Sequence, residues 1–503
     1  MEATLSKFSI PQRQSRVAIG IILIKFIRIT VKSFWPILLS FFLGGRNSDS
    51  FGQIIGYIAL GFAAFNLIGS ILTYFRFYFY LEEGAIIIDK GILKRTKTNI
   101  PFERIQTINF KQNILHQIFG VVSLEIDTAG AKKSELTIDA LNKEDAEELR
   151  NYILTEKAQI TTEESTPEEI EKAVLDEKEE EVLHLSVPDL FKVGVSQNHL
   201  RSMALLFAFV FSILNELNQN IPELVEDELS TYNDEVFNTG WIVFLITSII
   251  VIILSFIYSL VTTLLTNYDL RLSLRKGGLK LVKGLLNREE ISVNKKKVQI
   301  VSWSDNPIRM LFKMFTLQIE QASSADVDQL KSKIRVPGSY QQQVDAVIKT
   351  VFPEEYYREE TKHSVNKLLK YRIFFFLGAL PALAAGGSTF FFLEWESLYF
   401  LIWAVIVWLI TSLYYRKRSF EINDELLKNN RGTFGHHYEI TQLYKVQSVE
   451  VKQSWYQRRK QLANIVLYTA AGSVKIPFIR LDQAEALENF ILYRVESDRR
   501  EWM

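Results

Sequence analysis

The 503-residue sequence contains no cysteine, which excludes disulfides, zinc–thiolate sites, iron–sulfur clusters and thiol nucleophiles together. It also lacks a dominant charge, because Lys plus Arg and Asp plus Glu both number 58, so nucleic acid is not expected as a partner. No P-loop, nucleophile elbow, H-E-x-x-H or dinucleotide fingerprint occurs. The neighbours His436 and His437 would point to opposite faces of a strand, which is poor geometry for a metal. We therefore expect no enzyme activity, no metal and no cofactor.

What the sequence does contain is apolar residues gathered in uncharged blocks. Six blocks approach the length of about 20 residues that a helix needs to cross a bilayer. They are residues 26–45, 54–75, 202–220, 241–266, 373–393 and 397–415. The alternative for each block is a buried core helix, but their regular pairing argues against it. The pattern predicts three transmembrane hairpins.

The charges around these blocks predict an orientation. Residues 217–240 are acidic and contain no Lys or Arg, whereas basic residues such as Arg76, Arg271 and Arg416 lie at the opposite ends of the blocks. By the positive-inside rule, both termini and all large segments are expected in the cytoplasm. No signal peptide is evident, since residues 1–16 are polar and no small-residue cleavage site follows.

The three segments that follow the hairpins share a repeat. Residues 104–126, 297–319 and 445–467 align without a gap. The glycines fit turns that need a positive φ, and the glutamines are expected to tie a corner or an edge strand rather than to act in function. The coinciding positions are Gln106, Gln299 and Gln447 and, fifteen residues earlier, Gly91, Gly284 and Gly432.

Each repeat reads as short strands, a helical corner, further strands and a closing helix. The corners are expected at 113–119, 306–312 and 454–460, and the closing helices at 142–155, 341–351 and 481–495. On the first closing helix we expect Arg150 to face solvent. About 75 residues with six or seven short strands and a terminal helix fit a small, helix-plugged β-barrel or sandwich.

These signals divide the chain into seven segments. The acidic segment has few large apolar residues to bury, so it is expected to be solvated, either disordered or loosely helical. The segments are an amphipathic N-terminal segment with the first hairpin (1–76), β domain 1 (77–156), an acidic linker (157–184), an amphipathic helix with the second hairpin (185–267), β domain 2 (268–355), an amphipathic helix with the third hairpin (362–415) and β domain 3 (416–498).

Several of these motifs resemble a known family. The [RK]-[IV]-Q stretch, the corner ending ILHQIFG, the strand VVSLEIDTAG and the turn G-I-L-K-R are similar to those of the YdbT-type family, bacterial proteins with pleckstrin-homology-like (PH-like) domains on membrane hairpins. The match weakens in the third unit, where Lys460 and Gln461 replace Phe-Gly.

The resemblance implies an α+β membrane protein of the bacterial cytoplasmic (inner) membrane. Six transmembrane helices, as three hairpins, would alternate with three cytoplasmic PH-like domains, each closed by a C-terminal helix. A loosely defined role in envelope defence or stress tolerance is also implied, and catalysis is not.

Membrane lipids and a protein partner or second copy are the expected binding partners. Anionic headgroups attract nearby basic residues by about 1 kcal/mol each. The alternative, somewhat favoured, is that these residues are only topology signals on a solvated strand, and binding of a protein at a strand edge is equally open. The headgroup candidates are Arg271, Arg275, Lys276, Lys280, Lys283 and Arg288, with a weaker patch at Arg458, Arg459 and Lys460.

The sequence thus predicts a non-enzymatic membrane protein that uses its three β domains for lipid or protein binding and assembly. Membrane transport or lipid translocation is the alternative. The blocks have no ionisable group away from their ends, which counts against ion coupling. Gly378-x-x-x-Ala382 and Ala382-x-x-x-Gly386 suit close helix packing instead, and Pro36 and Pro381 are expected to kink their helices.

Overall fold

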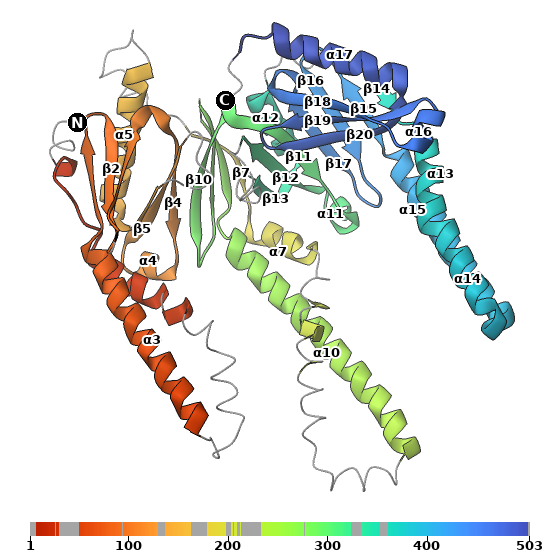
Figure 1. Cartoon of the computed structure of the whole chain (residues 1–503), viewed down its shortest axis with the longest axis horizontal. Helices are drawn as coiled ribbons and strands as arrows, with labels where there is room; N and C mark the ends of the chain where they lie inside the picture. Colours follow the sequence, from red (N-terminus) through yellow and green to blue (C-terminus); the bar gives the residue numbers. More distant parts are fainter. Residues whose placement is uncertain are drawn as a thin grey trace.

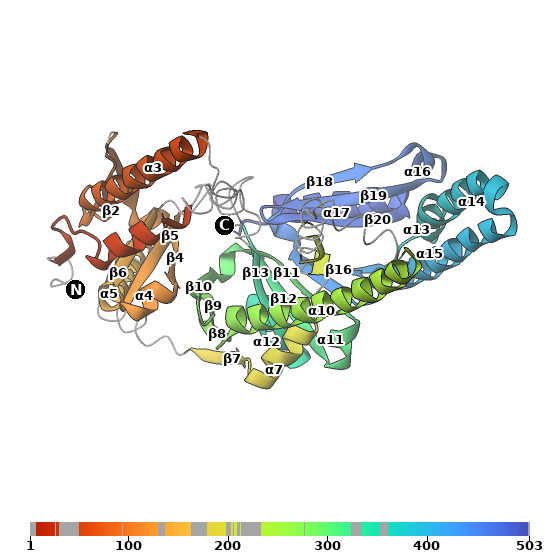
Figure 2. The same cartoon turned by 90° about the horizontal axis from the view of Figure 1, so that it is seen from below.

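Three β-rich units lie in a row, with unit 2 between units 1 and 3 (Figures 1 and 2). The computed structural model describes residues 7–25, 27–29, 50–92, 94–128, 136–161, 179–197, 203–204, 206–208, 212, 233–275, 277–322, 333–352 and 361–500. Unit 1 runs to residue 161, unit 2 covers 179–352 and unit 3 covers 361–500. The long helices leave the row on the same side (Figure 1).

Unit 2 shows the plan of the repeat. A strand and a short helix come first, then the membrane segment, six more strands and a closing helix. The elements are β7 (Glu180–His184), α7 (Val187–Val195), α10 (Asn233–Asn267), β8 (Arg271–Arg275), β9 (Gly278–Lys283), β10 (Arg288–Asn294), η3 (Lys295–Lys297), β11 (Val298–Ser304), α11 (Pro307–Leu311), β12 (Met314–Gln321), β13 (Lys333–Tyr340) and α12 (Gln341–Val351).

Units 3 and 1 repeat this plan. Unit 3 contains β14 (Thr361–Ser364), α13 (Leu368–Phe374), η5 (Phe375–Ala379), α14 (Leu380–Leu393), η6 (Glu394–Leu398), α15 (Tyr399–Arg416), β15 (Ser419–Ile422), β16 (Leu426–Arg431), β17 (His437–Gln442), η7 (Leu443–Lys445), β18 (Val446–Lys452), α16 (Trp455–Arg459), β19 (Leu462–Thr469), β20 (Gly472–Arg480) and α17 (Leu481–Ser497). Unit 1 contains α3 (Ser50–Phe75), β1 (Tyr78–Glu82), β2 (Ala85–Lys90), β3 (Thr96–Pro101), η1 (Phe102–Arg104), β4 (Ile105–Gln112), α4 (Ile114–Ile118), β5 (Val121–Thr128), β6 (Leu136–Asn142) and α5 (Lys143–Thr161).

The membrane segment is an insertion inside each unit, not a segment that precedes it. β7 pairs with β8 and β14 pairs with β15 across the membrane segment, and in unit 1 Gln12 bridges to Phe79. The expected start of β domain 2 at 268 and of β domain 3 at 416 is therefore wrong. The expected linker 157–184 is wrong at both ends, because α5 continues to Thr161 and Glu180–His184 is a strand. Leu183 on that strand is buried in the unit 2 core, which outweighs its acidic neighbours.

The aligned glycines have a common structural reason. Gly91, Gly284 and Gly432 have φ of 118°, 101° and 153° at the turn between the second and third strands that follow each membrane segment. A Cβ at each position would lie 2.0 to 2.2 Å from the carbonyl oxygen three residues later, so only glycine fits. The expected positive-φ turns are confirmed.

Sheets join strands from different units. The strand orders are β1-β2-β3, β6-β5-β4-β10-β9-β8-β7, β13-β12-β11-β17-β16-β15-β14 and β18-β19-β20. The two seven-stranded sheets therefore run from unit 1 into unit 2 and from unit 2 into unit 3. α5, α12 and α17 close the three units at the expected positions.

Within the described residues, three helices are long and apolar enough to cross a membrane, at Leu245–Asn267, Leu368–Phe390 and Tyr399–Arg416. α3 is also helical throughout the expected second block. The expected blocks 26–45 and 202–220 lie largely outside the described residues, as does Pro36. In the third hairpin a methyl group at Gly378 would lie 3.1 Å from the Val407 Cβ, and Ala382 is buried, so the small-residue pattern marks close packing.

Pro381 distorts its helix as expected. It has no N–H to donate to the Leu377 carbonyl one turn earlier, and the backbone there widens into the π-helical segment η5. The indole Nε1–H of Trp403, on α15, donates to that Leu377 carbonyl at 2.9 Å. The neighbouring helix thus satisfies the group that proline leaves free, as a lipid environment requires.

Candidate functional site

The strongest candidate site is the set of strand edges where units meet, which we call seams. In seam 1/2, β10 pairs antiparallel with β4, with Glu289 opposite Lys111 and Glu290 opposite Phe110. In seam 2/3, β17 pairs antiparallel with β11, and the ladder runs from Ser304 opposite His437 to Ile300 opposite Thr441.

The two seams have the same register. Moving 148 residues on from Glu290 gives Tyr438, and moving 193 residues on from Phe110 gives Trp303. Tyr438 lies opposite Trp303 just as Glu290 lies opposite Phe110. Equivalent edges of equivalent units therefore meet in the same way twice.

Seam 2/3 is held by side chains as well as by the backbone. Trp303 and Tyr438 stack with ring centroids 5.1 Å apart. The Asp305 carboxylate contacts His436 Nδ1 at 3.1 Å, so the corner of unit 2 holds the β16–β17 turn of unit 3. Apolar packing also crosses the seam, since Leu426 and Ile440 belong to the unit 2 core.

Lys445 is the most buried charged group of this seam. Only 2% of it is exposed, and its Nζ donates to the carbonyls of Lys296 at 2.9 Å and Val298 at 2.6 Å, both in unit 2. Burial lowers the pKa of Lys445 to about 8. The equivalent residue in unit 2, Lys297, is also buried at seam 1/2, and burial lowers its pKa to about 8 although Asp127 opposes this.

Seam 1/2 is shorter and more polar. Arg150 on α5 is 8% exposed and contacts Glu290 of unit 2 at 2.6 Å, so its expected position facing solvent is wrong. Burial would raise the pKa of Glu290, but Arg150 and Lys280 outweigh burial and hold it below its usual value. Ser292 N donates to Asn109 Oδ1 at 3.0 Å.

The burial of the aligned glutamines differs between strand edges that are covered and one that is not. Gln299, on β11 in seam 2/3, is fully buried, and Gln106, on β4, is half-buried. Gln447, on β18, is exposed. Among the equivalents of the four seam strands, β18 and β3 are the two that no described strand pairs on their outer side. Their residues are more exposed than those of β11 and β17, their covered equivalents.

The structure pairs the described headgroup candidates with carboxylates. Arg271 and Arg288 both approach Asp269, at 2.7 and 3.7 Å. Arg275 and Lys280 share Glu179, and Lys283 lies 3.9 Å from Glu289. Lys276 lies outside the described residues. The candidates thus share the first sheet of unit 2, but acidic neighbours balance their charge, and headgroup binding there stays a prediction.

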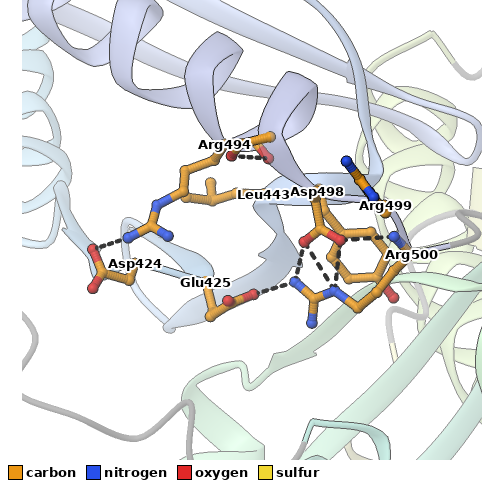
Figure 3. Close-up of a pocket in the computed structure, with 9 residues that line it drawn as sticks. Asp424, Glu425, Leu443, Arg494, Asp498, Arg499 and Arg500 are labelled. Carbon is orange, nitrogen blue, oxygen red and sulfur yellow. Dashed lines mark hydrogen bonds and ion pairs between the residues drawn. The ribbon is translucent and has the colours of Figure 1, made fainter.

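Unit 3 has a cleft of about 440 Å³ where the end of α17 meets the β15–β16 turn (Figure 3). Figure 3 shows Arg494 directed at Asp424, and Arg500 between Glu425 and Asp498. Arg500 also lies over the Tyr444 ring at 4.1 Å. These charges are paired with one another, which fits a contact that fixes α17 rather than a reaction centre. His436 and His437 are engaged by Asp305 and Arg431, and no group of three metal-ligating side chains occurs among the described residues.

Comparison with known families agrees with this repeat. The bacterial PH domain family matches residues 24–157, 220–354 and 373–495, which together exceed half of the chain. The chain belongs to the bacterial PH domain family. Each bacterial PH domain match covers at least part of a membrane segment together with the strands that follow it.

The chain is also similar to the UPF0699 transmembrane protein YdbT of Bacillus subtilis (strain 168). The two are 24% identical over 475 residues, covering 92% of this chain and 93% of YdbT. The resemblance drawn from the sequence motifs is confirmed. The protein is a transmembrane protein with three bacterial PH domains.

Sequence reasoning missed the residues that make the seams, among them Lys445, Arg150 and Asp305. The sequence of β11 held one signal. Its residues Val-Gln-Ile-Val-Ser-Trp place apolar side chains on both faces of the strand, and all six are buried. A strand covered on both faces and on both edges does not show simple alternation. Nothing in the local sequence, however, names the strand on the other side.

Proposed function

We propose that this protein is a non-enzymatic scaffold that binds protein strands edge to edge beside the membrane. The observation that carries the proposal is the repeated seam. A PH domain edge binds another PH domain edge twice, in one register, and one edge of each kind stays uncovered by any described strand. Addition of a strand to an open edge gives affinity through main-chain hydrogen bonds.

The scaffold is proposed to lie on the cytoplasmic face of a bacterial inner membrane, the side that the positive-inside rule predicts. The role in envelope defence remains a prediction from the family resemblance. Transport, the alternative, would require polar side chains between membrane helices. The described part of the third hairpin packs Gly378 against Phe374 and Val407 there.

Lipid contact is a second candidate, and the corner helices favour it over the basic patch. Large apolar side chains are exposed on all three corners, with Ile118 at 69%, Leu311 at 78% and Trp455 at 70% exposed. Each corner also packs near its own membrane segment or contacts the end of the short helix that precedes it.

Those contacts differ from unit to unit. Leu115 packs near Tyr74 in unit 1, Arg309 Nε donates to Ser196 Oγ in unit 2, and Tyr456 packs near Ile373 in unit 3. We infer that the corners dip into the interfacial layer, where apolar side chains gain burial without a specific headgroup.

One photocrosslinking experiment on the full chain in its native membranes tests both candidates. A benzophenone amino acid would replace Val451 on β18, Trp455 on the α16 corner or Arg271 in the basic patch. We expect protein adducts at 451 and lipid adducts at 455, with neither enriched at 271. A lipid adduct at 271 without a protein adduct at 451 would refute the scaffold and favour headgroup recognition, and a corner without lipid adducts would refute interfacial insertion.

A further inference from the structure

The two edges of the seam type that no described strand covers, β3 and β18, are complementary to each other. Each seam joins two kinds of strand. The first kind is the fourth strand of a unit, counted from the strand that precedes its membrane segment. It pairs with the second kind, which is the first strand of the second sheet in the preceding unit. β10 and β17 are edges of the first kind, and β3 is their equivalent in unit 1. β4 and β11 are edges of the second kind, and β18 is their equivalent in unit 3. The row therefore begins with one kind of edge and ends with the other.

We infer that β3 of one copy of this protein pairs with β18 of a second copy, so that copies join head to tail in the plane of the membrane. This inference rests on the proposed function and names the partner of its open edges. A contact of this kind is heterologous, and it closes into a ring or continues as a filament according to the rotation between copies.

The seams fix the register of the contact. We replace each β17 residue of seam 2/3 by its equivalent in unit 1 and each β11 residue by its equivalent in unit 3. Thr96 then lies opposite Lys452, Lys97 opposite Val451 and Thr98 opposite Glu450. Asn99 then lies opposite Val449 and Ile100 opposite Ser448. Like charges directly opposite each other would destabilise the ladder, and this register contains no such pair.

The features that protect β3 from random pairing do not prevent this ladder. Pro101 cannot donate a hydrogen bond, but its equivalents are not paired in either seam: Gln442 lies one residue and Asn294 four residues beyond the last residue of its ladder. Lys97 is an exposed edge lysine of the kind that discourages unspecific aggregation, and its proposed neighbour Val451 carries no charge.

A basic residue next to each seam gives a second, independent match. Lys297 and Lys445 follow the edge strand of their units and are both buried at a seam. Their equivalent in unit 1, Arg104, is exposed and stands beside the open β3 edge. Lys445 donates to the carbonyls of Lys296 and Val298. The equivalent carbonyls for Arg104 belong to Tyr444 in η7 and Val446 at the start of β18 in the second copy.

The membrane strengthens the case for a second copy over a soluble partner. The membrane helices of all three units leave on one side, so both open edges of every copy are held at a defined height above the bilayer. Two anchored copies meet at a high effective concentration and with part of their rotational freedom already removed.

The absence of native cysteine makes disulfide crosslinking the direct test. Two differently tagged full-length copies would be co-expressed in membranes, one with Thr96→Cys and the other with Lys452→Cys. Oxidation is expected to give a disulfide dimer that carries both tags, because residues directly opposite on antiparallel strands have Cα atoms about 4.5 to 5.5 Å apart. The matched positive control is Lys111→Cys with Glu289→Cys in one chain, the same pair in seam 1/2.

A control with a shifted register distinguishes strand pairing from crosslinks that form in random encounters of two copies. Lys97→Cys with Lys452→Cys is shifted by one residue, so the two thiols point to opposite faces and should give at most a tenth of the dimer. Equal dimer from both mixtures would overturn the inferred register. A crosslinked positive control without any mixed-tag dimer would overturn pairing between copies.

The crosslinked products also distinguish a failure of this inference from a failure of the proposed function. If the edge cysteines crosslink instead to a different protein, identified by mass spectrometry, the second copy is wrong and the scaffold stands. If the benzophenone at 451 captures no protein at all, the scaffold fails and this inference fails with it.

Discussion

At the scale of the residue, the buried amine of Lys445 shows how a seam depends on proton binding. Its pKa is about 8 in the folded protein and about 10.5 when unfolded. Between these values the unfolded state binds more protons, so the stability contributed by this site rises with pH from 8 to 10.5 and is flat below 8.

We therefore expect wild-type protein to gain stability relative to Lys445→Met by about 2 kcal/mol between pH 7 and pH 10. The measurement is the Tm of both proteins in detergent across that range. Lys475→Met, which removes an exposed lysine on β20, is the control and should follow wild type. Parallel curves for wild type and Lys445→Met would show that the amine titrates normally.

Within the third hairpin, Pro381 leaves a carbonyl without its helical donor, and the neighbouring helix supplies a replacement. Trp403→Phe keeps most of the ring but leaves the Leu377 carbonyl without its donor, which we expect to cost about 1 kcal/mol. In Pro381→Ala the backbone N–H returns and can satisfy the same carbonyl. Trp403→Phe should therefore cost less in the Pro381→Ala background.

A double-mutant cycle on detergent-solubilised protein, read by thermal or denaturant unfolding, measures this coupling. If Trp403→Phe lowers the free energy of unfolding equally in both backgrounds, the indole hydrogen bond does not compensate for the N–H that Pro381 lacks. A glycine-to-alanine change such as Gly378→Ala would not serve as control, because its methyl group crowds Phe374 and Val407.

At the scale of the whole molecule, the two seams differ in what crosses them. The core of units 2 and 3 shares residues, since Leu426 and Ile440 pack into unit 2 and Ile300 packs into unit 3. The core cluster of unit 1 contains only unit 1 residues, and seam 1/2 relies on a short ladder and on Arg150 with Glu290.

We expect unit 1 to open separately under mild denaturant, while units 2 and 3 open together. Hydrogen exchange of the detergent-solubilised protein should then show faster exchange at β4 and β10 than at β11 and β17. Glu290→Gln should speed exchange in β4 and β10 alone. Simultaneous release of all four strands would contradict this order.

Local sequence patterns were enough to predict the three-fold repeat, the alternation of apolar blocks with strand-rich segments, the glycine turns and the closing helices. Each depends on contacts between neighbours in sequence: periodicity fixes a buried face, and a turn that needs positive φ admits only glycine at positions such as Gly284. The conclusion that the chain carries PH-like domains also followed from such local motifs.

Three features depend on contacts between segments that are distant in sequence. They are the directions of the Arg150 and Lys445 side chains, the strand at Glu180–His184, and the pairing of one unit's edge with the next unit's sheet. Strand pairing uses backbone groups that every residue possesses, so a strand's sequence does not record which partner lies beyond its edge. A charged side chain likewise faces solvent by its local pattern and becomes buried only when a distant segment covers it. For that reason the strand edges that join the units can be identified only in the assembled sheets.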